Sequence, residues 1–201
     1  MQQFPPVPEN EMDRILSLPE FDLDYSDLQD KFKDFTKLAA YVAGTEVSLV
    51  NLIDLLISWT VSNFGLPIDQ ILREDSVCQY TIVAKKSFEV KNLTADERFK
   101  DKLYVTDHPK LTYYFGIPLQ TSDGFNIGTL CVFDKIGKEI SPEKAEFLKI
   151  IADEIVNRLT ALKVIQHLQT KVKDAKETQK KVAHDIRGYQ RIFLPLDCLG
   201  V

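Results

Sequence analysis

The sequence lacks several features that define whole classes of protein. Nowhere in its 201 residues is there a run of about 18 uninterrupted apolar residues, so the sequence predicts no membrane-spanning helix. The first 18 residues contain no basic stretch followed by an apolar run, and we therefore expect no signal peptide. The three cysteines are odd in number and far apart, which fits a reducing compartment and offers no metal-ligand spacing. Together these absences predict a cytoplasmic protein without a metal or other cofactor.

Glycine is also scarce, and acidic residues outnumber basic ones. The eight glycines each fall at a turn, and none belongs to a loop that could cradle a phosphate. The formal net charge is −5, and it is unevenly distributed: residues 163–201 sum to +4, so residues 1–162 sum to −9. An acidic body argues against a nucleic-acid partner, and the basic tail is typical of a solvated helix face.

The hydrophobic pattern predicts an α+β protein. Residues 1–9, with three prolines, are expected to form a leader, and Asn10 is a possible N-cap for a short helix over 10–18. Apolar residues at helical spacing predict a second helix through 28–42, with Asp24 or Ser26 as its cap and Gly44 after its end. Further elements are expected as strands at 47–53, 57–64, 87–90, 111–121 and 126–133, a short helix at 76–82 and one helical turn at 97–100. Because Asp123-Gly124 suits a tight hairpin, the last two strands should pair antiparallel.

A long helix is predicted from Ser141 onward. Ser141-Pro142-Glu143 is a strong helix start, and no later glycine or proline interrupts the chain before about residue 186. Beyond residue 160 the apolar residues narrow to a stripe with alternating steps of three and four, which is typical of a coiled-coil seam. The stripe consists of Ile165, Leu168, Val172, Ala175, Gln179, Val182 and Ile186. It predicts a parallel homodimer, the alternative being a single amphipathic helix docked on its own domain.

The end of this helix carries a candidate phosphoryl-transfer site. If Val182 and Ile186 lie in the seam, His184 faces outward, where a nucleotide-bearing domain could reach its imidazole. Asp185 could orient the ring. A His-Asp pair on a helix is more commonly a solvated surface pair, so spacing alone does not decide the matter.

The phrase His184-Asp185-Ile186-Arg187-Gly188 resembles the H-box of bacterial sensor histidine kinases. The resemblance implies that His184 accepts a phosphoryl group from ATP and passes it to a response regulator, with Asp185 as the adjacent acid. It also implies that an ATP-binding kinase domain is a partner. The family commonly has Thr or Asn where Gly188 stands and proline where Tyr189 stands. The sequence contains no nucleotide-binding boxes, so this chain is not expected to phosphorylate itself unaided.

Residues 10–160 resemble a GAF domain. The phrases that match, in order, are Leu38 to Ala40, Leu49 to Asp54, Ser76 to Cys78, Val90 to Phe99, Tyr113 to Leu119 and Ile127 to Asp134. The resemblance implies a GAF-like antiparallel sheet with helices on one face, a small-molecule pocket on the other, and a sensory role. We therefore expect a sensory domain at 10–160, a signalling coiled coil at 161–190 and a tail at 191–201 whose structure the sequence does not predict.

The ligand of such a domain is not predicted by the sequence. Cys78 is followed by Gln79 rather than His, which argues against a covalent bilin, and the cyclic-nucleotide pattern is not reproduced. An alternative function is a GAF-type free methionine sulfoxide reductase that uses Cys78 and Cys131, although both fit as core residues. The residues expected to line a ligand pocket are Trp59, Cys78, Tyr80, Tyr113 and Phe115. On an alternating strand Tyr113 and Phe115 face one side and Tyr114 the other.

Overall fold

A six-stranded antiparallel sheet forms the centre of the protein. The structure, a computed structural model, describes residues 6–18 and 25–193. The sheet order is β3-β2-β1-β6-β5-β4, and every neighbouring pair is antiparallel. The strands are β1 (Val47–Ile53), β2 (Ile57–Phe64), β3 (Gln70–Leu72), β4 (Phe88–Val90), β5 (Tyr113–Gln120) and β6 (Asn126–Asp134). This confirms the predicted α+β class and excludes a parallel sheet with crossover helices.

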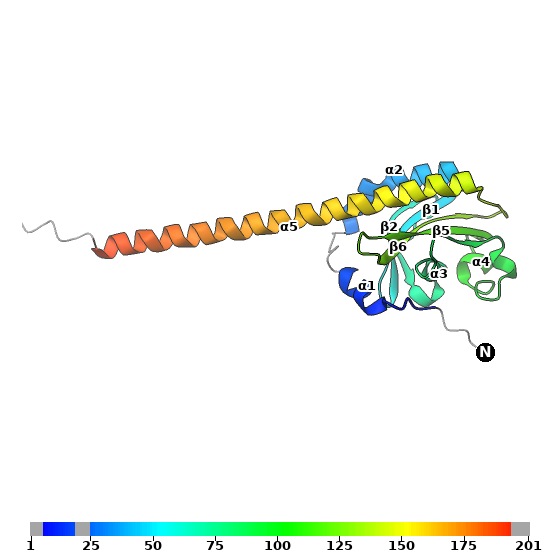
Figure 1. The fold of residues 1–201 in the computed structure, drawn as a ribbon, viewed down its shortest axis with the longest axis horizontal. Coiled ribbons are helices and arrows are strands. Elements are labelled where there is room, and N and C mark those ends of the chain that lie inside the picture. Colours follow the sequence, from blue (N-terminus) through cyan, green and yellow to red (C-terminus); the bar gives the residue numbers. More distant parts are fainter. Residues whose placement is uncertain (1–5, 19–24, 194–201) are drawn as a thin grey trace, which may run out of the picture. The chain divides into compact units, whose positions relative to one another are not determined.

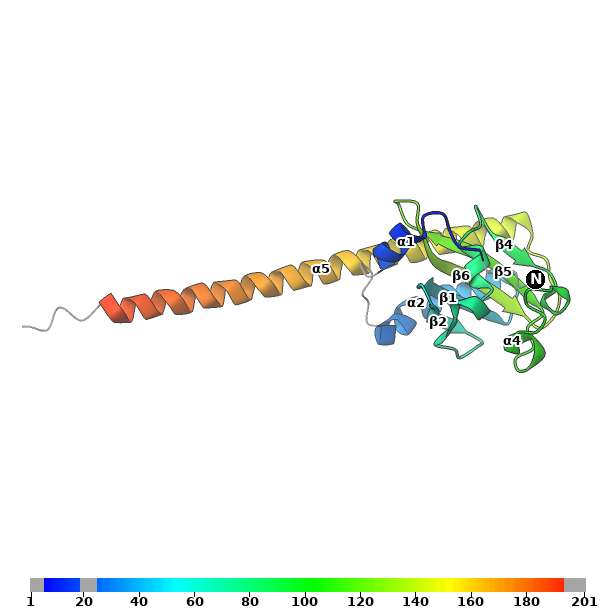
Figure 2. The same cartoon turned by 90° about the horizontal axis from the view of Figure 1, so that it is seen from below.

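Helices cover both faces of the sheet, with the long helices on one face and short helices on the other. The long helices are α2 (Tyr25–Ala43) and α5 (Pro142–Phe193), and the shorter elements are α1 (Glu11–Ser17), η2 (Arg73–Asp75), α3 (Cys78–Thr81), η3 (Leu93–Ala95) and α4 (Leu103–Thr106). Figures 1 and 2 show α2 and the first part of α5 side by side on one face, with α1, α3 and α4 on the other. The Arg158 guanidinium lies over the Phe35 ring, and Lys144 donates to the Ala43 carbonyl at 3.2 Å, which ties α5 to α2.

The chain divides into two compact units, residues 1–160 and 161–201. The first unit contains the sheet and the hydrophobic core. The second consists of the later part of α5, whose apolar stripe is about half exposed. In the described ranges no helix is both apolar enough and long enough to cross a lipid bilayer.

Local sequence signals explain where several elements begin and end. Gly44 has φ +73° after α2, as a helix C-terminus favours, and the Ser141 hydroxyl accepts from the Lys144 backbone N–H at the start of α5. In the β5–β6 hairpin Gly124 has φ +87°, and the two strands pair antiparallel as predicted. The Asp24 cap lies outside the described residues.

Two strands at the centre of the sheet approach unusually closely at Gly128. A Cβ atom at this position would lie 2.0 Å from the Asn51 carbonyl oxygen on β1, which is backbone and has little room to move. We expect Gly128→Ala to lower the free energy of unfolding by about 2 kcal/mol, because β1 and β6 must separate locally. Gly137→Ala is the matched control, because its Cβ would meet only the Lys91 carbonyl oxygen at 3.8 Å. Urea unfolding of both variants measures the difference, and equal stabilities would refute the close approach.

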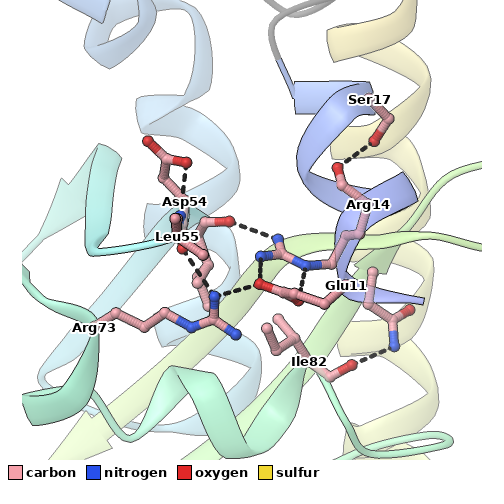
Figure 3. Close-up of polar contacts among 9 residues, drawn as sticks. Glu11, Arg14, Ser17, Asp54, Leu55, Arg73 and Ile82 are labelled. Carbon is pink, nitrogen blue, oxygen red and sulfur yellow. Dashed lines mark hydrogen bonds and ion pairs between the residues drawn. The ribbon is translucent and has the colours of Figure 1, made fainter. Parts of the chain in front are cut away.

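A buried ion triad fastens α1 to the sheet (Figure 3). Arg14 is fully buried and donates to both Glu11 carboxylate oxygens at 2.8 Å and to the Ile53 carbonyl at the end of β1. Arg73, from η2, donates to the same carboxylate and to the Asp54 carbonyl at 3.1 Å. The Glu11 carboxylate therefore links α1 to η2, and Arg14 links α1 to β1.

Candidate functional site

A cluster of buried polar groups lies on the sheet face opposite α2. Cys78 begins α3 and Cys131 lies in the middle of β6, and their sulfur atoms are 3.6 Å apart. The Asn51 side-chain nitrogen, from β1, lies 3.2 Å from the Cys78 sulfur and 3.8 Å from the Cys131 sulfur. Tyr114, on β5, shares a 2.6 Å hydrogen bond with Thr81 of α3. Three neighbouring strands and one short helix thus bring these groups together.

The two thiols are buried in an apolar surrounding. Cys78 is 2% exposed and Cys131 is 0% exposed, and both belong to a core cluster with Leu49, Tyr114 and Phe133. A hydrogen bond from the Cys131 thiol lowers the pKa of Cys78 to about 6, although burial opposes this. Burial raises the pKa of Cys131 well above its ordinary value, and the neighbouring Cys78 raises it further. The contact between the two thiols therefore favours the ionised form of Cys78, and burial disfavours the ionised form of Cys131.

The structure separates the residues that were expected to line one pocket. Cys78 and Tyr80 lie on the α3 side of the sheet, where Tyr80 packs against Phe88 and Phe99. Tyr113 and Phe115 alternate with Tyr114, as predicted, and so point to the opposite, α2 side of the sheet. Trp59 is half-buried on β2, paired with Gln70 of β3. Their shared role as a ligand site remains a prediction.

An aromatic cluster fills the space between the sheet and the α4 loop. The Arg98 guanidinium lies 4.9–5.2 Å from the centres of the Tyr80, Phe88 and Phe99 rings, and Asp96 holds it through two hydrogen bonds. Beside it is a surface pocket of about 450 Å³. The pocket is lined by Ile71, Asp75, Glu97, Arg98, Asp101, Lys102, Leu103 and Tyr104, so none of the five predicted pocket residues borders it.

Sequence reasoning missed the polar members of the buried cluster. Asn51 is a single amide within the apolar strand 47–53, and a buried polar residue in such a run was the available signal. Its side-chain oxygen and the Thr129 hydroxyl have no hydrogen-bond partner among the described residues. No group of three or more His, Cys, Asp or Glu side chains suited to a metal ion occurs in the same residues.

The second candidate site lies in the other unit, on α5. The His184 side chain is 85% exposed, and its Nδ1 lies 3.6 Å from a carboxylate oxygen of Asp185. At about 100° per residue, His184 projects about 200° from Val182, so the ring and the apolar stripe occupy opposite sides of the helix. The His184 side chain thus has the exposure that a phosphoacceptor requires. The roles of His184 and Asp185 remain predictions.

The fold belongs to a known class. No family model matches the sequence. The GAF domain of an Acinetobacter phosphoenolpyruvate-protein phosphotransferase superimposes with a TM-score of 0.57 at 13% identity, over 77% of this chain and 98% of that one. A domain of a putative two-component sensor histidine kinase from Sinorhizobium meliloti gives 0.56 at 10% identity, over 71% and 98%. The protein therefore has the GAF-like α+β fold that the sequence resemblance predicts.

Two further similarities are to proteins with different activities. A type II free methionine-R-sulfoxide reductase of Thermoplasma acidophilum superimposes with a TM-score of 0.56 at 12% identity, over 67% of this chain and 94% of that one. A cyclic di-GMP phosphodiesterase of Pseudomonas aeruginosa is 36% identical over 131 residues, 65% of this chain. The chain spans only about a fifth of that relative's length, 22%, so the match concerns one part of a longer enzyme.

Proposed function

We propose that this chain is the sensory part of a longer signalling protein and that it relays its state through α5 to the phosphoacceptor His184. One observation carries the proposal. An exposed histidine, in a phrase that resembles the H-box, lies on the same helix that packs against the sheet of a GAF-like fold. The S. meliloti neighbour, a domain of a putative sensor histidine kinase, supports this pairing of fold and output.

The chemistry assigned to the helix is phosphoryl transfer to nitrogen. A neutral imidazole nitrogen of His184 attacks the γ-phosphorus of ATP held by a separate kinase domain, and ADP leaves. Asp185, with a carboxylate oxygen 3.6 Å from the His184 Nδ1 atom, would steady the orientation of the ring. The phosphoryl group then passes to an aspartate of a response regulator, which restores the free histidine.

The relay needs a partner helix, and we assign that role to a second copy of the chain. Ile165, Leu168, Val172, Val182 and Ile186 are each 51–55% exposed on the isolated helix. Their heptad spacing places them in one narrow seam, which a parallel copy would cover. A small ligand bound by the first unit would then act by shifting α5 against its partner.

We expect Leu168→Asp to abolish dimerisation at micromolar concentration. The new carboxylate would face its symmetry mate across the seam, where burial of like charges is strongly unfavourable. Thr170→Asp is the matched control, because residue 170 lies about 200° around the helix from residue 168. Sedimentation equilibrium of the three proteins measures the effect. If the unsubstituted chain and both variants are all monomeric, there is no coiled coil.

The sensed ligand is proposed to be a small molecule bound on the α3 and α4 side of the sheet. The Arg98 aromatic cluster and the adjoining 450 Å³ pocket are the features that support this position. Native mass spectrometry of the protein as isolated, followed by the same measurement on Arg98→Ala, tests it. A bound mass that is present in the first sample and absent from the second identifies the site.

The reductase alternative has less support. It requires two thiols close together at a pocket that admits free methionine sulfoxide. The sulfur atoms meet the first requirement at 3.6 Å, but neither residue is open to a substrate of that size.

A second candidate function follows from the P. aeruginosa relative. The match covers only 22% of that cyclic di-GMP phosphodiesterase. In this second candidate, the present chain is a regulatory region attached to a domain that hydrolyses a cyclic dinucleotide. The phosphorylation experiment separates the two candidates. When this chain is supplied with an ATP-binding kinase domain and labelled ATP, acid-labile phosphate on the chain supports the histidine relay, and its complete absence favours the other output.

A further inference from the structure

The buried thiol pair is unexplained by the proposed relay. The Cys78 and Cys131 sulfur atoms are in van der Waals contact at 3.6 Å, across the boundary between α3 and β6. The sulfur–sulfur distance in a disulfide bond is about 2.05 Å, so the two sulfur atoms would have to approach each other by about 1.5 Å to form one. α3 is a single four-residue turn, which gives Cys78 more freedom to move than Cys131 has within the central strand.

One polar side chain within the otherwise apolar surroundings of the pair, that of Asn51, favours an ionised sulfur. Asn51 is 3% exposed and directs its amide nitrogen at both sulfur atoms, while its side-chain oxygen has no partner within the described part of the chain. A buried amide is costly when its hydrogen bonds are unmade, so an apolar residue would be the simpler filler at this position. A thiolate at Cys78 would make the amide N–H donation stronger. The lowered pKa of Cys78 agrees with this geometry.

We propose that Cys78 and Cys131 are a redox modification site that forms an intramolecular disulfide on reaction with a small hydroperoxide such as hydrogen peroxide. The Cys78 thiolate attacks one peroxide oxygen, the O–O bond breaks, and hydroxide leaves and takes up a proton to form water. The Cys131 sulfur then attacks the Cys78 sulfenic acid, the S–O bond breaks, and a second water leaves with the Cys131 proton. Two thiols are oxidised by two electrons, and the peroxide is reduced to two water molecules.

Burial selects the oxidant rather than preventing the reaction. Neither thiol is exposed, so a charged or large oxidant has no path to the pair in the resting fold. Hydrogen peroxide is uncharged and similar in size to water, and the short elements η2 and α3 offer a local opening. The bond would fix α3 to β6, the strand that ends at Asp134 shortly before α5 begins. The site does not depend on the His184 proposal.

The test uses the Cys198→Ser chain, because Cys198 lies outside the described residues and would confuse thiol counts. After hydrogen peroxide treatment and unfolding in urea, we expect the number of titratable thiols to fall from two to none per chain. Peptide mapping should show one linked pair, containing residues 78 and 131, that dithiothreitol separates. Circular dichroism before treatment confirms that the protein is folded.

Two matched variants test the order of events. In Cys131→Ala, in the same background, Cys78 loses its thiol donor and should react with peroxide at least about tenfold more slowly at pH 7. Asn51→Leu should also slow disulfide formation, because it removes the amide donor beside the Cys78 sulfur. If two thiols remain after treatment of the folded chain, or if Cys78 is over-oxidised without a bond to Cys131, the proposal is overturned. The measurement on the unsubstituted pair decides the matter even if a variant fails to fold.

Discussion

Glu11→Gln should lower the free energy of unfolding by about 3 kcal/mol at pH 7, because it removes the single carboxylate between two buried guanidinium groups. In the native chain Glu11 accepts from Arg14 at 2.8 Å and from Arg73, and its side chain is 16% exposed. A neutral amide would leave two like charges facing each other without compensation. Urea unfolding at pH 7 measures the change. Glu9→Gln is the matched control and should shift stability by less than about 0.5 kcal/mol.

The same carboxylate should make the protein sensitive to acid. Burial raises the pKa of Glu11, but hydrogen bonds from Arg14 and Arg73 outweigh it and lower the pKa to about 2, from an ordinary 4.5. A lowered folded pKa means that the contribution of Glu11 is complete above about pH 5 and is lost as the pH falls toward 2. The stability difference between the unsubstituted chain and Glu11→Gln should therefore narrow in acid. A difference that stays constant from pH 7 to pH 3 would show that the triad contributes no pH dependence.

Much of the fold follows from local sequence signals. The apolar runs at 47–53 and 57–64 coincide with β1 and β2, and the start of α5 follows Ser141-Pro142-Glu143. The signal was weaker where elements are short. β3, with three residues at the sheet edge, was not predicted. The turn expected at 97–100 is one hydrogen-bonded turn, in which the Lys100 backbone N–H donates to the Asp96 carbonyl at 2.8 Å, and the short helices η3 and α4 that flank it were not predicted. Single turns have little intrinsic stability, so tertiary packing fixes them.

The candidate sites likewise divide into one that local sequence predicts and others that depend on tertiary packing. His184 and Asp185 are adjacent in sequence, so a helical reading alone predicts their exposure and their separation from the seam. The pairing of Cys78 with Cys131 joins residues far apart in the chain, and it depends on how α3 packs against the centre of β6. The Glu11 triad likewise requires η2 to return beside α1. Such long-range contacts have no periodic signature that one sequence could reveal.

His184 is expected to be the only site of acid-labile phosphate in the chain. Its side chain is exposed and lies on the face of α5 opposite the apolar stripe, so a kinase domain could approach without displacing the proposed partner helix. His167 is also exposed on the same helix and provides a natural control. The His184→Gln change removes the nucleophile, whereas His167→Gln should leave phosphorylation unchanged.

The most direct test of the account compares two variants of the chain supplied with an ATP-binding kinase domain and labelled ATP. One retains His184 and carries His108→Gln and His167→Gln, and the other carries only His184→Gln. The account predicts full acid-labile labelling of the first protein and a complete loss of labelling in the second, which is at least a 100-fold difference if the background is about 1%. Acid-labile phosphate that persists in His184→Gln, or its absence from the variant that retains His184, would contradict the assignment of His184 as the phosphoacceptor.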